Sequence, residues 1–519
     1  MSDILSILPP LVAVVIAVTT KRVFFSLFAA ILVGGLIISS GNPVLAVVES
    51  FNWIKESMVD EWHMRFLVII ALLGSGAAFM HKTGGSIALI KSLERVIVGR
   101  RSAQLFTWIL GLLVFFNDYV NSAIVGNATR DIMAKYKVSR EKLSYLLDTT
   151  AAPVSTLGPV SDWIGYQVSL IAAAFVAMSF VDQSPYMMFL QSVPWNFYCI
   201  LSLLAIPMII MYGDFGPMAE AEHRAQTTGE LVAKGDSPLS DVDHELGDPI
   251  HPEKASIWNF IFPIIALISV ALWSMWFTGG GLENTDKSVM GVFGDSDISI
   301  GLVWASFAMT AVGIIMALKS GINVSQCEEI MLSGFRTMLP AIVTMILAWS
   351  VAGVTSTLGT AEYVISITEN WLTPALLPML VFVIGMFIAF ATGTSWGTMA
   401  ILTPIAIPLA FQVGDMSLVP IALGAIFSGA VFGDHCSPIS DTTVMSSIFA
   451  GSDHIAHVKT QIPYALVPAA IAAILYLASS VLNSSIILLA VGVIAQLAVI
   501  RFLAKKAKNK EPVGEGVHI

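Results

Sequence analysis

Apolar stretches of about 20 residues recur along the whole chain, separated by short polar or charged segments. An α-helix of that length spans about 30 Å, which is the thickness of the hydrocarbon core of a bilayer. Several stretches are longer than one crossing needs and contain polar residues that a lipid-facing helix would exclude. The pattern therefore predicts an all-α polytopic membrane protein in which some helices are broken. The apolar segments lie near residues 4–18, 22–40, 64–83, 102–134, 143–182, 186–213, 257–277, 298–318, 338–358, 374–412, 418–450, 463–482 and 485–503.

The composition excludes a soluble protein of this length. Of the 519 residues, 56% are apolar and 12% are charged, whereas a soluble domain carries about 25% charged residues. Lipid must therefore serve as the solvent, and the chain forms one body instead of several soluble domains. Asp3 precedes the first apolar run without any basic residue, so we expect that helix to be retained and not cleaved as a secretory signal. The three cysteines lie far apart and predict neither a disulfide framework nor a metal site.

The distribution of Lys and Arg predicts how the chain is oriented, because cytoplasmic loops of membrane proteins carry an excess of these residues. We place the N-terminus outside and Lys21–Arg22 inside, and let the later segments alternate. Only Lys55, Arg65 and Lys287 are then outside, so 23 of the 26 basic residues face the cytoplasm. The C-terminus, with its basic tail, is cytoplasmic as well. This arrangement indicates a multi-pass protein of a bacterial inner membrane.

Two polar interruptions predict re-entrant hairpins. Segment 104–134 has basic residues at both ends, so both ends should face the cytoplasm, although its 31 residues would span about 45 Å as a straight helix. A hairpin meets both constraints if its turn holds the polar groups that lipid cannot satisfy. A second hairpin is predicted in 374–412, with a break at residues 392–398 and both ends facing outward. The turn of the first hairpin would contain Asn117, Asp118, Asn121, Ser122, Gly126 and Asn127.

A short internal repeat predicts two related halves. Pro159-Val-Ser-Asp162 recurs as Pro438-Ile-Ser-Asp441, 279 residues later, and each copy follows a predicted hairpin. The charge distribution gives the halves opposite orientations, so we expect two inverted-topology repeats, each with a re-entrant hairpin and broken helices. Such repeats are typical of secondary transporters, whose sites lie at the midplane between them. The expected domains are a first transmembrane repeat at 1–213, an acidic cytoplasmic linker at 214–255, a second inverted transmembrane repeat at 256–482, and a final helix with a basic tail at 483–519.

Ionisable side chains inside apolar segments cost roughly 2.5–3.5 kcal/mol each, so those that remain are candidates for function. Carboxylates, amide oxygens, hydroxyls and the carbonyls of broken helices are ligands for a hard cation such as Na⁺. A carboxylate in a partly dry site can also exchange a proton for that cation near neutral pH, which is the minimal chemistry of cation/proton antiport. The expected ion-binding and proton-coupling residues are Asp118, Asn117, Asn121, Asp162, Ser161, Asp434, Asp441, Ser440, Thr442, Thr394 and Ser395, with Asp148, His435 and Asn127 as secondary candidates.

Other interpretations of these residues stay open. Asp148 and Asp441 could instead cap helices by accepting hydrogen bonds from backbone N–H groups. His435 could relay protons or could pack as a hydrogen-bonded core residue. His454 and His457 have helical spacing, but no carboxylate accompanies them in the sequence, and we expect them in a cytoplasmic loop. The linker, with ten Asp or Glu against three Lys or Arg, is typical of a solvated segment.

No catalytic or nucleotide-binding motif occurs in the sequence. It contains neither Gly-x-x-x-x-Gly-Lys-[Ser/Thr] for phosphate binding nor His-Glu-x-x-His for a metalloprotease. Gly74-Ser-Gly76 lacks the third glycine of a dinucleotide fold and is typical of close helix packing. We therefore expect no enzyme activity and no cofactor beyond transported Na⁺ and H⁺. A membrane-bound sensor would need an attached signalling domain, and the linker is too short and too polar to form one.

The segment Gly433-Asp-His-Cys-Ser-Pro-Ile-Ser-Asp-Thr-Thr443 resembles the NhaC-type sodium/proton antiporter family. Phe116-Asn-Asp-Tyr-Val-Asn-Ser-Ala-Ile-Val-Gly-Asn127 is similar to the pattern of that family's first half, and the similarity continues through Ser139–Asp148 and Ala152-Pro153. The resemblance covers most of the chain from about residue 60 to residue 480. It implies membership of a wider ion-transporter superfamily with inverted repeats, paired re-entrant hairpins and often a homodimer.

The resemblance also implies Na⁺/H⁺ exchange, with Asp118, Asp162, Asp434 and Asp441 carried over as candidate residues. Proteins similar to this family include malate–lactate exchangers and amino-acid transporters, so a Na⁺- or H⁺-coupled transporter of a small organic solute is the alternative. A carboxylate substrate needs a buried Arg or Lys, or a helix N-terminus. No basic residue lies well inside the second half, and Arg130 is the one candidate in the first, so the sequence favours cation/proton antiport.

Overall fold

The computed structural model of the chain describes residues 4–20, 22–93, 97–115, 118–158, 161–177, 184–238, 248–283, 292, 296–360, 363, 373 and 375–508. Within these ranges all regular structure is helical. Seven of the described helices are long and apolar enough to cross a membrane. A pair bent by 46°, Pro185–Trp195 with Phe197–Tyr212, can form an eighth span. The expected all-α polytopic architecture is therefore confirmed.

The described helices of the first half include both members of the predicted first hairpin, α6 and α7. They are η1 (Ile4–Ile7), α1 (Leu8–Thr20), α2 (Val23–Ile38), α3 (Pro43–Val59), α4 (Glu61–Lys82), α5 (Gly85–Leu93), α6 (Arg100–Leu113), α7 (Asp118–Lys135), α8 (Arg140–Ser155), α9 (Asp162–Ala177), α10 (Pro185–Ser192), η2 (Val193–Trp195), α11 (Phe197–Tyr212) and α12 (Pro217–Thr228). Those of the second half are η3 (Pro252–Lys254), α14 (Trp258–Thr278), α16 (Ile298–Lys319), α17 (Val324–Leu358), α19 (Leu377–Thr392), α20 (Ser395–Cys436), α21 (Asp441–Ala450), α22 (His454–Ala478) and α23 (Ser485–Lys508).

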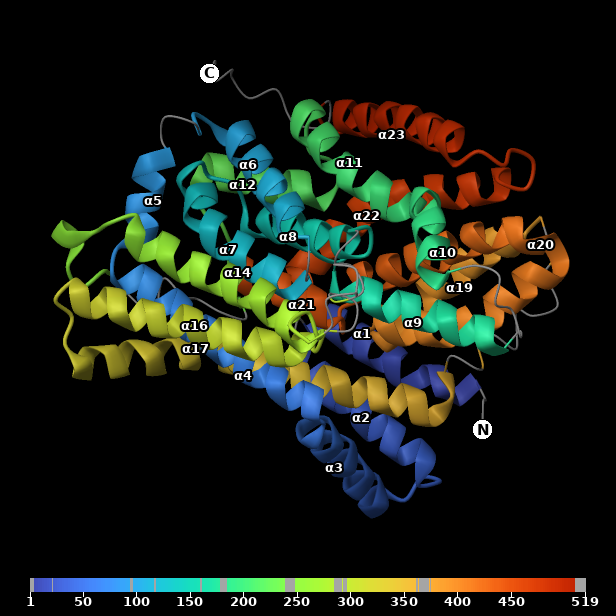
Figure 1. Ribbon diagram of the computed structural model, residues 1–519, viewed down its shortest axis with the longest axis horizontal. Coiled ribbons are helices and arrows are strands. Elements are labelled where there is room, and N and C mark those ends of the chain that lie inside the picture. The colour runs from blue at the N-terminus through green and yellow to red at the C-terminus, as the bar shows by residue number, and fades with distance from the viewer. Residues whose placement is uncertain are drawn as a thin grey trace.

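The early helices of the two halves pack on one another. α4 lies against α16 and α17, α14 lies against α16, and both α2 and α3 contact α17. These helices occupy the left and lower parts of the view in Figure 1. At Gly74 an added Cβ would lie 2.6 Å from the Gly334 carbonyl oxygen, so α4 and α17 approach closely there. At Gly76 the neighbour is Met309 of α16. The small-residue packing expected for Gly74–Gly76 is confirmed.

The other helices form a second group in which α8 contacts α6, α7, α11, α21 and α22. Figure 1 shows α11 and α23 at the top of this group and α9, α10, α19 and α20 on its right. α20 folds back on itself, because a Cβ added at Gly385 of α19 would contact both Leu402 and Ala430, at 3.3 and 3.4 Å. A straight helix would separate those two residues by about 42 Å. The 42 residues of α20 therefore form two arms, and the second, Met416–Cys436, is long enough to cross a membrane.

Both predicted hairpins contain a break between two helices. The first break lies between Leu113 and Asp118, so the expected turn was too wide, and Asn121, Ser122, Gly126 and Asn127 lie inside α7. The second break falls at Gly393 and Thr394, within the expected interval. The helices on either side of each break contact one another. That the two hairpins are re-entrant in a bilayer stays a prediction.

The acidic linker is more ordered than its composition indicated. α12 packs against α8 and α22. Arg224 Nη2 donates to both carboxylate oxygens of Glu141 at 2.8 and 2.9 Å, which fixes α12 to the first turn of α8. Farther along, the Ser237 amide donates to Asp453 Oδ2 at 2.9 Å, beside the start of α22. The described part of the linker therefore covers one end of α8 and α22 instead of extending into solvent.

Candidate functional site

A cavity of about 560 Å³ lies where the breaks of the two halves meet. α7 and α21 each reach it with their first residues, and the tip between α19 and α20 forms another part of its wall. Residues about 320 positions apart in the sequence therefore share one space, as expected for a site between two repeats. Five of the residues predicted from the sequence line it: Asp118, Asp441, Thr442, Thr394 and Ser395.

The second Pro-x-Ser-Asp copy forms the start of α21. Ser440 is the N-cap, and its Oγ accepts a hydrogen bond from the Thr443 amide at 3.3 Å. Asp441 is the first helical residue, where the helix dipole favours negative charge. Its Oδ1 accepts from the Thr442 amide at 2.8 Å, and its Oδ2 accepts from the Tyr119 hydroxyl at 2.7 Å. Ser440, and not Asp441, therefore caps α21. Asp441 faces the cavity.

In the described part of the first copy, Ser161 takes the capping role that Ser440 has in the second. Ser161 Oγ accepts from the Ile164 amide at 3.3 Å and donates to the Ser155 carbonyl oxygen at 2.7 Å. α9 then begins at Asp162, as α21 begins at Asp441. The side chain of Asp162 and the whole of Asn117 lie outside the described residues, so these two predictions have no structural counterpart here.

The tip between α19 and α20 is held on two sides. Gly393 has φ +69°, and a Cβ there would lie 2.6 Å from the Ile439 carbonyl oxygen, just before α21. Thr394 Oγ1 accepts from the Gly397 amide at 3.3 Å and so caps α20. On the other side, the ring of Tyr166 in α9 stacks on Trp396 at 4.3 Å. Ile439 of the second Pro-x-Ser-Asp copy and the helix that follows the first copy, α9, therefore flank the tip that carries Thr394.

Asp434 is buried beside the cavity without being part of its lining. Thr442 Oγ1 donates to Asp434 Oδ2 at 3.3 Å and lies 3.0 Å from Ser440 Oγ. The hydroxyl of Thr443 donates to the Asp434 carbonyl oxygen at 3.3 Å. The Thr442 hydroxyl thus joins Asp434 to Ser440, and the backbone amide of the same residue donates to Asp441.

Asn121 joins three chain segments near the first break. Its Nδ2 lies 2.7–2.8 Å from the carbonyl oxygens of Gly111, Val114 and Thr150, and so satisfies the end of α6 and links it to α8. This contact supports the element that carries Asp118. Asn127 is not part of the same cavity and lines a separate hollow of about 30 Å³.

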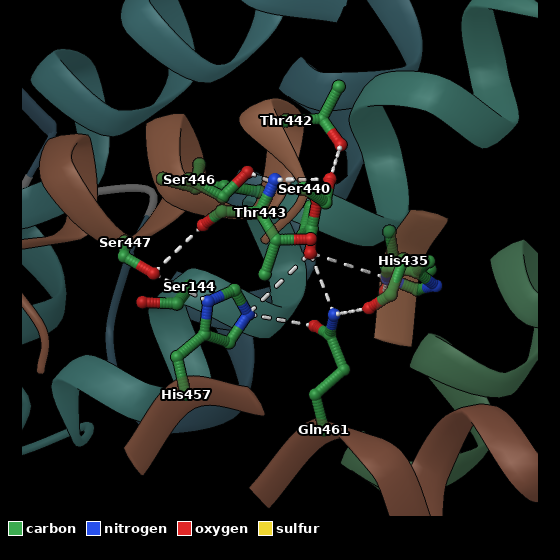
Figure 2. Close-up of polar contacts among 12 residues, drawn as sticks. Ser144, His435, Ser440, Thr442, Thr443, Ser446, Ser447, His457 and Gln461 are labelled. Atoms are coloured by element: carbon green, nitrogen blue, oxygen red, sulfur yellow. Dashed lines mark hydrogen bonds and ion pairs between the residues drawn. The ribbon is translucent and has the colours of Figure 1, made fainter. Parts of the chain in front are cut away.

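Asp148 and His435 lie in a second polar cluster, of which Figure 2 shows His435, His457 and Gln461. Asp148 is in the middle of α8, so it does not cap a helix. Gln461 Nε2 donates to its Oδ2 at 2.7 Å, and Ser446 Oγ donates to its Oδ1 at 3.3 Å. His435 Nδ1 lies 2.7 Å from the Tyr198 hydroxyl. Both predicted residues are buried and hydrogen-bonded, at a distance from solvent.

The expectation that His454 and His457 lie in a cytoplasmic loop is wrong. α22 begins at His454, and both rings are buried, at 1% and 0% exposure. His457 Nε2 lies 3.8 Å from Asp148 Oδ2. This carboxylate could not be predicted, because Asp148 belongs to the other half of the chain and only the packing of α8 on α22 brings the two residues together.

Several residues of the cavity wall were missed because they come from α3, α4 and α17, whose polar positions carry no motif. The ring of His63 stacks on Trp349 with centroids 4.0 Å apart and an interplanar angle of 7°. Glu56 and Asp60 are exposed and so mark the open end of the cavity. Trp53 lies beside them in the wall. None of the described residues that line the cavity is Lys or Arg.

Comparison with known proteins decides the family. The sequence model of the Na⁺/H⁺ antiporter family matches residues 154–481, which is more than half of the chain. The chain belongs to this family. An uncharacterized protein of Haemophilus influenzae is 32% identical over 517 residues, covering 97% of this chain and 96% of that one. The malate-2H⁺/Na⁺-lactate antiporter of Bacillus subtilis is 29% identical over 186 residues, covering 36% of this chain and 38% of the relative.

Two solved transporter structures have a low similarity to the chain. MtrF of Neisseria gonorrhoeae has a TM-score of 0.34 and 16% identity, covering 93% of this chain and 88% of MtrF. The YdaH transporter of Alcanivorax borkumensis has a TM-score of 0.38 and 14% identity, covering 81% and 90%. Membership of the Na⁺/H⁺ antiporter family confirms the resemblance found in the sequence. It makes the chain a multi-pass membrane protein and a secondary transporter of the antiporter type, not an enzyme.

Proposed function

We propose that the chain exchanges Na⁺ for H⁺ at the 560 Å³ cavity, where Asp118 and Asp441 bind the two ions in turn. The observation that carries this proposal is the presence of two carboxylates in one space: Asp118 follows the first break, and Asp441 starts α21 in the other half. Thr442, Thr394 and Ser395 bring hydroxyl oxygens to the same wall, and hard cations prefer such ligands. With no Lys or Arg among its described lining residues, the cavity suits a cation.

The exchange follows from the cost of burying charge. Two ionised carboxylates in a partly dry cavity repel one another, and either Na⁺ or H⁺ relieves that repulsion. The two ions therefore compete, and each is released when the other binds. Asp434, Asp162, Ser161, Ser440 and Asn117 complete the proposed ion-binding set, which Asn121 supports by holding the first break.

We further propose that exchange proceeds by alternating access. The early helices of both halves, which pack on one another, act as the scaffold, and the hairpins with α8, α9, α20 and α21 move against it. In this scheme residues 1–213 and 256–482 are the inverted repeats, 214–255 is the cytoplasmic linker, and 483–519 is the final helix and tail. The scaffold helices carry a homodimer interface. The protein lies in a bacterial inner membrane with its N-terminus outside and its C-terminus in the cytoplasm.

A Na⁺- or H⁺-coupled exchanger of a small organic solute is the second candidate. Its supporting observation is the size of the cavity, which falls within the range of about 300–1,000 Å³ that holds small molecules. The Bacillus subtilis relative is named as a malate–lactate antiporter. Against a carboxylate substrate stand Glu56, Asp60, Asp118 and Asp441 in the same wall.

Proton flux in sealed proteoliposomes tests the proposal. We expect a pH dye inside the vesicles to respond to added NaCl and not to choline chloride. The response should disappear in Asp118→Asn and persist in Asp248→Asn, which changes an exposed aspartate of the linker. Silence with NaCl alone, followed by a response when malate, lactate or an amino acid is added, would favour the second candidate. Normal exchange by Asp118→Asn would remove the central residue of the proposal.

A further inference from the structure

One hydroxyl group in the cluster of Figure 2, that of Ser447, lies within hydrogen-bond distance of three other groups. Ser447 Oγ lies 2.8 Å from the Thr443 carbonyl oxygen, 3.0 Å from His454 Nδ1 and 2.8 Å from His457 Nδ1. A serine hydroxyl has a single hydrogen to donate, although it can accept two hydrogen bonds. The protonation of the two rings therefore decides how many of these contacts are hydrogen bonds.

The outer nitrogen of each ring is fixed as a donor. His454 Nε2 lies 2.9 Å from the Pro438 carbonyl oxygen, which can only accept, so that nitrogen carries a hydrogen. His457 Nε2 lies 2.8 Å from Gln461 Oε1. The Gln461 amide cannot be reversed, because its Nε2 faces Asp148 Oδ2 at 2.7 Å and also donates to the His435 carbonyl oxygen. His457 Nε2 therefore also carries a hydrogen.

With both rings neutral, both Nδ1 atoms are bare. Three acceptors then face the one hydrogen of Ser447, and two of them are left without it. One more proton changes the count: a protonated His457 Nδ1 donates to Ser447 Oγ, whose own hydrogen goes to His454 Nδ1 or the Thr443 carbonyl. We propose that this buried network is a proton-binding site separate from the cavity, in which His457 Nδ1 takes up one proton and Asp148 supplies the counter-charge.

Charge favours His457 over His454 as the ring that is protonated. His457 Nε2 lies 3.8 Å from Asp148 Oδ2, and both groups are at most 1% exposed. An ionised Asp148 on its own would be a single buried charge, whereas an imidazolium beside it forms a neutral pair. The proton enters from water as an N–H bond forms at Nδ1, and it leaves when that bond breaks, so the network alternates between one negative charge and none.

The titratable groups around His457 come from four neighbouring helices. α8 contributes Asp148, and α20 contributes His435, whose Nε2 is 3.9 Å from Asp148 Oδ2. α11 contributes Tyr198, in contact with His435. On α22 itself lies His454, and α21 brings Asp441 as its one titratable residue. α19 contains no titratable residue. Two other helices pack on α22, namely α12 and α23. Their charged side chains are Glu220, Glu222, His223 and Arg224 of α12, and Arg501, Lys505, Lys506 and Lys508 of α23.

α21 links this network to the cavity. Its first residues, Asp441 and Thr442, line the cavity, while Ser446 and Ser447 on its next turn belong to the network. The inference rests on the proposed function and adds to it, because a proton at His457 joins the one exchanged at the cavity carboxylates. The protein would then move more than one proton for each Na⁺, and its exchange would respond to membrane potential.

Nitrogen-15 NMR of histidine-labelled protein in lipid tests the site without any transport assay. We expect an imidazolium signal that appears as the pH is lowered, is missing in His457→Gln, and is lost in Asp148→Asn, where the counter-charge is gone. His457→Asn is the second variant if His457→Gln fails to fold, because exposed rings such as His223 also give imidazolium signals and only the loss of a signal identifies His457. If every buried ring stays neutral until the protein unfolds, the proposal is overturned.

The number of protons moved per Na⁺ is the second readout, obtained from the pH gradient that halts flux at a fixed Na⁺ gradient and membrane potential. We expect wild type to move more than one proton per Na⁺ and His457→Gln to fall toward one. His223→Gln, which removes an exposed ring of α12, should match wild type. An unchanged ratio in folded His457→Gln would contradict the proposal. If wild type shows no Na⁺-driven proton flux, the proposed function fails, and the NMR result alone decides whether His457 binds a proton.

Discussion

The Tyr119 hydroxyl donates a hydrogen bond of 2.7 Å to Asp441 Oδ2 and so joins the first turn of α7 to the first turn of α21. The two residues are 322 positions apart, and each follows a helix break in its own half of the chain. The neighbour of Tyr119, Asp118, faces the same cavity. One hydrogen bond therefore connects the two helix starts that carry Asp118 and Asp441, and both helices belong to the group that moves against the scaffold in the proposed cycle.

Tyr119→Phe should make Na⁺ binding more sensitive to acid. A hydrogen bond to a charged group contributes about 1.5–3 kcal/mol, and its loss leaves the ionised form of Asp441 less stabilised. Protons then compete better, so we expect the half-saturating Na⁺ concentration to rise about tenfold at acidic pH and little at alkaline pH. Na⁺ titrations of the dye response at a series of pH values would measure this half-saturating concentration.

Tyr136→Phe is the matched control, because its hydroxyl donates to the backbone carbonyl of Ile97 away from the cavity. We expect its Na⁺ titrations to follow wild type at every pH. A Tyr119→Phe protein whose Na⁺ requirement rises equally at all pH values would show that the hydroxyl acts on Na⁺ itself and not through the proton.

Gly393→Ala should stop transport with little loss of folding. The φ of +69° costs a non-glycine residue about 1–2 kcal/mol, and the added Cβ would lie 2.6 Å from the Ile439 carbonyl oxygen. The tip that carries Thr394 and Ser395 must then move away from α21. Gly229→Ala has a similar φ, +77°, with nothing within 4 Å, and should exchange normally. Equal activity in the two variants would mean that the close approach at Ile439 is not required.

The central residues of the site could be predicted from the sequence because they are polar residues next to helix-breaking residues within apolar segments. Asp118 and Asp441 are carboxylates beside helix breakers in apolar segments, and Thr394–Ser395 follows a Gly in the middle of an apolar run. Each feature is local, and the internal repeat implied that local features of the two halves would meet. The structure places all four residues in one cavity.

What the sequence did not predict depends on which helix faces touch. His63 and Trp349 line the cavity, but nothing local distinguishes their positions from other polar or aromatic positions of α4 and α17. His457 was misplaced for the same reason, since its carboxylate neighbour Asp148 is supplied by another helix. The width of the first turn was overestimated because Asn121 favours breaks in sequence statistics, whereas here its side chain satisfies the carbonyls at the end of α6 from inside α7.

Asn121→Ala should lower both stability and transport rate. Its amide group serves the carbonyl oxygens of Gly111, Val114 and Thr150, and burying acceptors without a donor costs about 1–3 kcal/mol. Thermal unfolding in detergent would report the stability, and the dye assay the rate. Asn259→Ala removes a comparable buried amide, which donates to the Thr83 carbonyl at 2.9 Å in the scaffold.

We expect Asn259→Ala to unfold earlier than wild type but to exchange at a normal rate, because Asn259 does not support a helix that bears a site carboxylate. If Asn121→Ala instead has a weaker apparent Na⁺ affinity and an unchanged unfolding midpoint, Asn121 has a direct role in Na⁺ binding. That outcome would make its side-chain oxygen a Na⁺ ligand and not a support of the break.

The losses in free energy of unfolding from changing Lys142 and Asp214 one at a time should add up to more than the loss from changing both. Lys142 is 1% exposed, and its Nζ lies 2.6 Å from Asp214 Oδ1, which also accepts from the Tyr464 hydroxyl at 2.7 Å. Removing one partner leaves an uncompensated buried charge, so Lys142→Met and Asp214→Asn should each lower the free energy of unfolding by about 3 kcal/mol.

The double variant should lose less than the sum of the two single variants, because neither charge is then left alone. Unfolding midpoints of the four proteins in one detergent would measure this coupling. Lys234→Met is the control, since that side chain is 86% exposed in its pair with Glu230 and an exposed pair contributes at most about 1 kcal/mol. Strictly additive losses at Lys142 and Asp214 would mean that the pair does not fasten the linker to α8, and that α12 is held there by its other contacts, such as Arg224 with Glu141 and the Ser139 amide with Glu222.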